Sequence, residues 1–143
     1  MDYKDFKKFV YATTFESAFK LGEIALENKD FEGAILNFTQ ALEFNPNSLE
    51  ANAHKLLCLF ALNRFEACIP IGEKLILIEP DKERNYVTLA NCYMELKEYD
   101  KAENYFTKAI SIDPKNYMNF TQRGESRLRN GKYHEAFLIF QSV

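Results

Sequence analysis

The sequence has no long hydrophobic run and no excess of positive charge. Its longest apolar stretch, Leu56 to Leu62, is far shorter than the roughly 20 residues with which a helix crosses a bilayer. The stretch therefore predicts no transmembrane helix. The formal net charge of -3 provides no positive field that would draw the chain to nucleic acid or to an anionic membrane. We expect neither of them as a partner.

The groups that a catalytic or metal site needs are also scarce. Only two histidines are present, His54 and His134, and no His or Cys pair has the spacing of zinc ligands. No glycine-rich phosphate loop and no nucleophile with a neighbouring base can be recognised. The sequence therefore predicts no enzyme, no cofactor and no metal.

The N-terminus lacks the apolar stretch and the small-residue cleavage site of a signal peptide, since Met1 to Tyr11 alternates Lys and Asp with Phe and Tyr. The three cysteines, Cys58, Cys68 and Cys92, are odd in number and occur where a helix would bury a small side chain. Both features are typical of a cytoplasmic protein with reduced, buried thiols. Residues 1–14 are expected to form an N-terminal segment with a short helix.

The same pattern of residues recurs along the chain at a fixed interval, which we call the repeat length. One repeat length separates Pro46 from Pro80, and another separates Pro80 from Pro114. Further sets keep the same interval: Phe31, Phe65, Tyr99 and Tyr133; Ala34, Cys68, Ala102 and Ala136; Phe38, Gly72, Phe106 and Phe140. A fixed period of this length indicates a stack of similar structural units.

Each unit is predicted to contain two helices of about 13 residues, because apolar residues recur every three or four positions. The first pair is expected at Phe15–Glu27 and Phe31–Phe44, with a turn at residues 28–30. Pro46 ends the second helix, since proline lacks the backbone donor and clashes with the preceding turn.

Two further features refine the predicted helix bounds. Thr13 and Glu16 have the spacing of a capping box, which predicts that the first helix begins near Thr14. Pro70 lies near the start of the second unit's second helix, where it is tolerated in the first turn and predicts a local distortion if it lies deeper.

The residues of the third unit resemble those of the tetratricopeptide repeat family. They are Tyr86, Leu89, Ala90, Tyr93, Ala102, Phe106, Ala109 and Pro114. The first unit agrees through Leu21, Gly22, Ala34, Phe38, Ala41 and Pro46, and the fourth through Phe120, Gly124, Ala136 and Phe140. The resemblance implies an all-α, right-handed superhelical stack of antiparallel helix pairs over residues 15–143. The expected repeats are 15–48, 49–82, 83–116 and an incomplete 117–143.

The small residues of this pattern have a packing role, because the two helices of a unit touch most closely there. Gly22 is therefore expected against Phe38, and Gly124 against Phe140. The second unit departs from the family, since Leu56 stands where a glycine is usual and Gly72 where an aromatic ring is usual. We interpret this exchange as the same volume with its halves swapped.

In this family the first helices of successive units line a concave groove that binds other proteins. The resemblance assigns the following residues to it: Phe19, Glu23, Leu26, His54, Leu57, Phe60, Arg84, Val87, Thr88, Asn91 and Met94. An apolar floor with a polar rim favours a peptide or an amphipathic helix of a partner protein. The alternative is that Leu57 and Phe60 are ordinary core.

Many relatives bind the terminal carboxylate of heat-shock chaperones through a clamp of basic and amide side chains. The matching positions here hold Phe19, Glu23, His54, Arg84 and Thr88, so only Arg84 keeps the required charge. Glu23 would repel a carboxylate, and the other replacements cannot make charge-assisted contacts of comparable strength. We therefore expect no carboxylate clamp.

Two features of the fourth unit leave alternatives open. Arg123 and Arg127, one helical turn apart, either give the last unit a polar outer face or bind an anionic peptide segment. Phe137, Phe140 and Val143 are either covered by further repeats of a longer protein or form a face for homodimerisation. The main prediction is a protein-interaction scaffold, and the alternative is a self-associating assembly adaptor or secretion-type chaperone.

Overall fold

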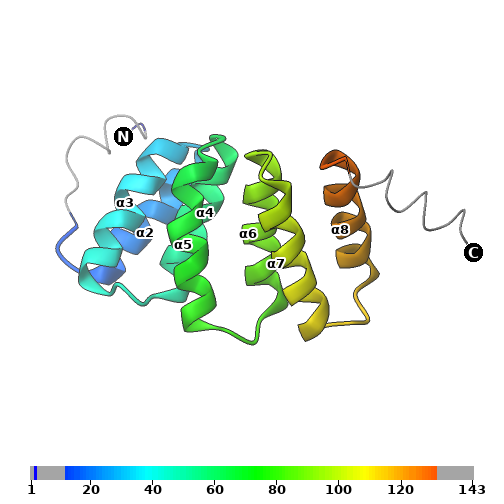
Figure 1. Cartoon of the computed structure of the whole chain (residues 1–143). Helices are drawn as coiled ribbons and strands as arrows, with labels where there is room; N and C mark the ends of the chain where they lie inside the picture. The colour runs from blue at the N-terminus through cyan, green and yellow to red at the C-terminus, as the bar shows by residue number, and fades with distance from the viewer. Residues whose placement is uncertain (1, 3–11, 132–143) are drawn as a thin grey trace, which may run out of the picture. The chain divides into compact units, whose positions relative to one another are not determined.

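The computed structural model describes Asp2 and residues 12–131, and all regular structure in that part of the chain is helical. Seven helices follow one another there (Figure 1): α2 (Phe15–Glu27), α3 (Phe31–Phe44), α4 (Leu49–Ala61), α5 (Phe65–Ile78), α6 (Glu83–Glu95), α7 (Tyr99–Ile112) and α8 (Tyr117–Arg129). The first two have the bounds that the sequence predicts, which confirms the reading of polar turns and prolines as helix ends.

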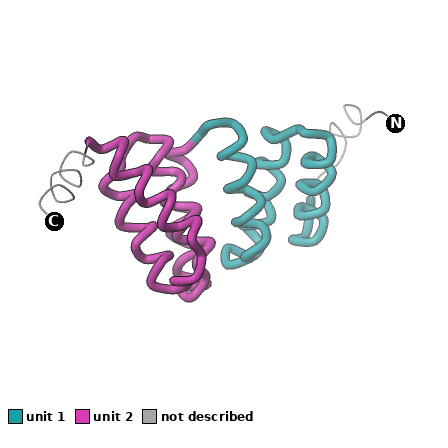
Figure 2. Tube along the Cα trace, turned by 90° about the vertical axis from the view of Figure 1, so that its right-hand side faces the viewer, with its two compact units in different colours: residues 1–64 teal, residues 65–143 magenta. Residues whose placement is uncertain are grey.

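The chain divides into two compact units (Figure 2). Unit 1 comprises residues 1–64, and within it α3 packs against both α2 and α4. Unit 2 comprises residues 65–143, and within it α6 packs against α5 and α7, while α7 also packs against α8. The all-α fold of antiparallel helix neighbours predicted from the sequence is confirmed.

The first helix begins with a capping box one residue later than the sequence predicts. Thr14 has an extended backbone, and its hydroxyl accepts from the N–H of Ser17 at 3.1 Å. The Ser17 hydroxyl in turn accepts from the N–H of Thr14 at 3.1 Å. The expected pair of Thr13 and Glu16 is therefore wrong, because two short hydroxyl side chains satisfy these donors instead of a glutamate.

The turn after each first helix contains a residue with a left-handed backbone. These residues are again one repeat length apart: Lys29 (φ 55°), Asn63 (φ 58°), Lys97 (φ 60°) and Gly131 (φ 76°). In the first turn the N–H of Asp30 donates to the Ala25 carbonyl at 2.8 Å, and that of Lys29 to the Leu26 carbonyl at 2.9 Å. This pair of bonds is a Schellman motif, for which glycine is the preferred residue.

A side chain six residues after the proline donates to the proline carbonyl in two repeats. The amide of Asn52 donates to Pro46 at 3.1 Å, and the hydroxyl of Tyr86 donates to Pro80 at 2.8 Å. Different residue types thus perform the same local function. The equivalent position of the fourth repeat holds Phe120, which has no donor.

Pro70 is the sixth residue of α5, so it lies beyond the first turn. The helix continues through it as an α-helix, and the local distortion that the sequence suggested does not interrupt α5. Since Pro70 has no N–H, the carbonyl of Glu66 loses its usual helical donor.

Replacing the left-handed lysines by glycine should stabilise the protein. We expect Lys29→Gly and Lys97→Gly each to raise the free energy of unfolding by about 0.5 to 1 kcal/mol, because glycine adopts φ > 0 without steric cost. Urea denaturation measures the change. Lys20→Gly is the control inside α2, where the same replacement should cost about 1 kcal/mol. Equal effects at all three positions would contradict the explanation.

Removing the hydroxyl that binds the proline carbonyl should destabilise the third repeat. Tyr86 is 7% exposed, so Tyr86→Phe is expected to lower the free energy of unfolding by about 0.5 to 1.5 kcal/mol. Phe120→Tyr is the reciprocal variant, which supplies a donor near Pro114 and should raise stability by a smaller amount. Urea unfolding with unchanged m-values would measure both; a neutral Tyr86→Phe would show that the bond contributes nothing.

Candidate peptide-binding site

In unit 1, four aromatic rings form one cluster that joins α2, α3 and α4. The Phe19 ring lies 5.4 Å from that of Phe38 and 5.7 Å from that of His54, and it also stacks on Phe15 at 5.7 Å. The His54 and Phe38 rings stack at 5.2 Å with an interplanar angle of 21°. Phe38 is fully buried, whereas Phe19 and His54 are half-buried. Two residues assigned to the groove by resemblance therefore also form part of the packing.

Gly22 permits this arrangement, because a Cβ atom added there would lie 2.6 Å from the Phe38 ring. The contact between Gly22 and Phe38 that the sequence predicts is confirmed. In unit 2, Ala90 and Phe106 are both fully buried in one core cluster. Gly72 of α5 approaches Leu89 of α6 in the same way, since an added Cβ atom would lie 2.7 Å from that side chain.

The other predicted residues of unit 1 divide into packed and outward positions. Leu26 is half-buried and packs on the core, and Phe60 is also half-buried. Glu23 is half-buried and pairs with Lys20 at 3.4 Å. Leu57 is 57% exposed. The exposed leucine is therefore not core, which excludes for Leu57 the alternative left open by the sequence.

In unit 2 the predicted residues are those of α6. Arg84 forms an ion pair with Glu79 at 3.0 Å, and the hydroxyl of Thr88 donates to the Arg84 carbonyl at 2.8 Å. Val87 and Met94 are half-buried against the core. Asn91 is half-buried, and its amide has no hydrogen-bond partner within the part of the chain that the structure describes.

One repeat position differs in chemistry from unit to unit. Its four residues are Glu23, Leu57, Asn91 and Glu125. The two glutamates pair with lysine or arginine on their own helices. Leu57 is exposed, and the Asn91 amide makes no hydrogen bond to any described residue. Two of the four side chains are therefore available for a partner.

Arg123 and Arg127 bind α7 from the neighbouring helix α8. Arg127 donates from Nε to Glu103 at 2.8 Å, and Arg123 donates to the hydroxyl of Thr107 at 3.3 Å. The Arg123 guanidinium also lies 5.5 Å from the centre of the Phe120 ring. Both arginines therefore stabilise the contact of α7 with α8, a role that the sequence did not reveal.

The predicted self-association residues Phe137, Phe140 and Val143 lie outside the described residues. Within α8, the exposed large apolar side chains are Tyr117 (81%), Met118 (62%), Leu128 and Phe120.

A polar network holds the start of α8. Asn116 donates to Glu83 of α6 at 2.6 Å, and the buried Asn119 donates to the same carboxylate.

The predicted burial of the three cysteines is confirmed, and all three are free thiols. Burial raises the pKa of Cys58. A hydrogen bond with Cys68, followed by burial, raises the pKa of Cys92, and the same bond lowers the pKa of Cys68.

Among the described residues no group of His, Cys, Asp and Glu could hold a metal ion. Nor does any helix of the described part have the length and apolarity to cross a membrane.

Comparison with known families agrees with this architecture. Two family models of the tetratricopeptide repeat match, one over residues 15–48 and another over residues 86–116. The chain belongs to the tetratricopeptide repeat family.

Its similarity to characterised proteins covers a small part of each of them. The protein STIP1 homolog of Dictyostelium discoideum is 28% identical over 112 residues, which is 78% of this chain and 19% of the relative. The DnaJ homolog subfamily C member 7 homolog of the same organism is 30% identical over 105 residues, 71% of this chain and 20% of the relative. The chain thus spans about a fifth of the length of these curated relatives.

Solved structures share the fold. MamA from Desulfovibrio magneticus RS-1 superposes with a TM-score of 0.76 at 21% identity, covering 90% of this chain and 72% of that one. The first repeat domain of Spaghetti (RPAP3), solved bound to the HSP90 peptide SRMEEVD, gives a TM-score of 0.72 at 11% identity over 85% of this chain and 97% of that one.

Replacing Gly22 by alanine should destabilise unit 1 through its contact with Phe38. We expect Gly22→Ala to cost about 1 to 3 kcal/mol, because the aromatic ring cannot yield as a flexible chain would. In Gly22→Ala/Phe38→Leu the smaller leucine makes room for the added methyl group. The destabilisation of this double variant should therefore be at least about 1 kcal/mol smaller than the sum of the two single destabilisations. Urea denaturation of the four proteins measures the coupling, and simple additivity would contradict a direct steric contact.

Proposed function

We propose that the chain is a non-catalytic scaffold that binds a peptide or an amphipathic helix of another protein on the first-helix faces of its repeats. The observation that carries this proposal is the half-buried Asn91 amide, which has no hydrogen-bond partner among the described residues. Solvent reaches the Asn91 amide in the free protein, and a bound backbone can replace that water with both a donor and an acceptor.

The exposed Leu57 adds an apolar contact at the equivalent repeat position. Half-buried His54 lies one helical turn before it on α4, above two phenylalanine rings. In unit 1, an apolar side chain next to a ring cluster can accept a hydrophobic anchor residue of a partner. In unit 2, the Asn91 amide can bind a partner's backbone. The proposed partner therefore presents apolar anchors rather than a cluster of charges.

We infer that the partner is not the C-terminal carboxylate of a chaperone. One solved relative carries an HSP90 peptide, and an Hsp70-Hsp90 organizing protein of Arabidopsis thaliana is 28% identical over 90 residues, 63% of this chain and 16% of that protein. In this chain, Phe19 and His54 pack as rings, and the Glu23 carboxylate pairs with Lys20. Neither Phe19 nor Glu23 can donate a hydrogen bond to a carboxylate ligand. We propose the cytoplasm as the place of action.

Self-association is the second candidate, because Tyr117 and Met118 expose much of their apolar surface at the start of α8. Contiguous exposed apolar side chains are typical of interaction sites. Light scattering over a concentration series distinguishes the two candidates: a dimer that Met118→Glu abolishes would favour the adaptor, and a monomer throughout would favour the peptide scaffold.

Selection of a peptide library on the purified chain tests the main proposal. Asn91→Ala and Leu57→Glu should each weaken binding of a selected peptide about tenfold or more, measured by fluorescence anisotropy. Leu77→Glu is the matched control, because Leu77 is 82% exposed on the second helix α5 and should leave affinity unchanged. Equal losses at Leu57 and Leu77, or none at Asn91, would contradict the assignment of the binding face.

The labelled peptide SRMEEVD tests the exclusion of the chaperone carboxylate. We expect a Kd weaker than about 1 mM, because only Arg84 of the matching positions is basic and it already pairs with Glu79. Saturable binding at micromolar concentrations would refute this part of the proposal.

A further inference from the structure

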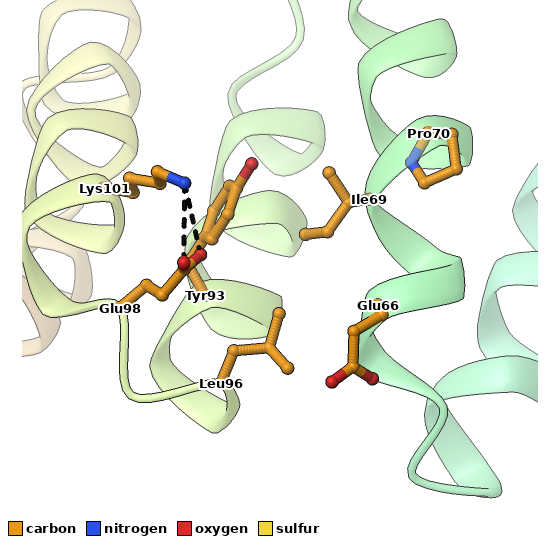
Figure 3. A pocket seen from close by; sticks show the side chains of 7 residues that line it. All are labelled: Glu66, Ile69, Pro70, Tyr93, Leu96, Glu98 and Lys101. Carbon is orange, nitrogen blue, oxygen red and sulfur yellow. Dashed lines mark hydrogen bonds and ion pairs between the residues drawn. The ribbon is translucent and has the colours of Figure 1, made fainter.

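A pocket of about 470 Å³ opens in unit 2 between the beginnings of α5 and α7 and the end of α6 (Figure 3). Its lining residues are Glu66, Ile69, Pro70, Tyr93, Leu96, Glu98 and Lys101. Of these, Tyr93 lies at the end of α6, Leu96 and Glu98 lie in the turn that follows it, and none belongs to the predicted peptide-binding residues. The pocket is therefore separate from the face discussed above.

The pocket combines apolar walls with an excess of negative charge. Ile69, Pro70 and Leu96 provide apolar surface, and the Tyr93 ring is fixed by stacking on Tyr105 at 5.6 Å with an interplanar angle of 8°. Lys101 lies 5.3 Å from the centre of the Tyr93 ring. An aromatic ring held by two contacts and three apolar side chains favour recognition of a side chain with an apolar stem.

The carboxylate of Glu66 is exposed and has no ion-pair or hydrogen-bond partner in the part of the chain that the structure describes. The cation that lines the pocket, Lys101, pairs with Glu98 at 3.4 Å. Figure 3 shows the Glu66 carboxylate on the α5 side, facing Leu96, while Lys101 and Glu98 lie on the other side. One negative charge of the pocket is thus not compensated.

The repeats themselves show which group fits this carboxylate. Each of the described second helices, α3, α5 and α7, carries an acid at its second residue: Glu32, Glu66 and Asp100. In unit 1 the guanidinium of Arg64 binds both oxygens of Glu32, one of them at 3.1 Å. In unit 2 Asn130 donates to Asp100 at 2.8 Å. Among these three acids, Glu66 of α5 alone has no such donor within residues 12–131.

The difference has a simple origin in the sequence. One repeat length after Arg64 the chain has Glu98, and at the same position of the next repeat it has Lys132. One repeat length before Arg64 the chain has Asp30, which has no earlier second helix in the described chain to face. The position that supplies Arg64 to Glu32 therefore supplies a second carboxylate, Glu98, to the pocket that Glu66 lines. An arginine from outside would restore the bidentate pair that Arg64 makes in unit 1, and its planar guanidinium suits a carboxylate better than an ammonium does.

We propose that this pocket binds an arginine side chain of a partner protein, with the guanidinium on Glu66 and the methylene stem along Pro70, Ile69 and Leu96. The pocket thereby gives the scaffold a second contact for a basic segment of a partner. This inference does not depend on the proposed peptide-binding face, because no residue is shared.

The test uses the full chain, labelled with ¹⁵N, and the blocked tripeptide acetyl-Gly-Arg-Gly-amide. Saturable chemical-shift changes are expected at the amides of Glu66, Tyr93 and Leu96. The same tripeptide with citrulline, a neutral isostere of arginine, should give none. Equal shifts with both peptides would overturn the proposal.

Two variants assign the charge. Glu66→Gln should raise the midpoint of the titration about fivefold, as expected for the loss of one partly exposed charge-assisted bond. Glu50→Gln, on the exposed surface of α4, is the control and should leave the midpoint unchanged. If it weakened binding as much as Glu66→Gln does, the peptide would be responding to overall charge and the proposal would fail.

A third variant recreates the arrangement of unit 1. Glu98→Arg places a cation at the repeat position of Arg64, so it should pair with Glu66 and abolish the shifts caused by the arginine tripeptide. Unaltered binding to Glu98→Arg would overturn the proposed location. Light scattering adds one further outcome: self-association that Glu66→Gln removes would assign the pocket to a second copy of this chain and refute a different partner protein.

Discussion

The close approach of two helices at a small residue is the constraint on which the rest of the structure depends. Gly22 lets the Phe38 ring lie directly on the backbone of α2. The buried Phe38 then carries Phe19 and His54, whose rings join the first helices of two repeats within unit 1. Ala90 and Phe106 belong to one core cluster in unit 2. A methyl group added at Gly22 would therefore disturb both the core and the face above it.

Repetition separates the side chains that build the fold from those that remain available. Where the repeat positions are satisfied internally, the same local structure recurs from repeat to repeat, as in the turns at Lys29 and Lys97. Where the pattern fails, a group has no partner among the residues that the structure describes, as with the Asn91 amide and the Glu66 carboxylate. The proposed peptide site rests on the first of these groups and the proposed arginine pocket on the second, because a ligand can supply the hydrogen-bond partner that the repeat does not.

Much of this fold could be predicted from the sequence, because prolines and polar turns mark the helix ends and small residues mark the close contacts. The capping box was misplaced by one residue, since hydroxyl pairs and Thr-Glu pairs have the same spacing. The site was harder to predict. Repeat position alone could not show that Phe19 and His54 pack together or that Arg127 pairs with Glu103. The sequence contains the change from Arg64 to Glu98 at one repeat position. Only the structure shows that this change leaves two carboxylates lining one pocket.

Hydrogen exchange of the chain with and without a selected peptide tests the central claim, that the first helices present the binding face. The account predicts slower amide exchange in α4 and α6 around Leu57 and Asn91 when the peptide is bound, with α3 and α7 unchanged. Protection confined to the second helices of the repeats would contradict it.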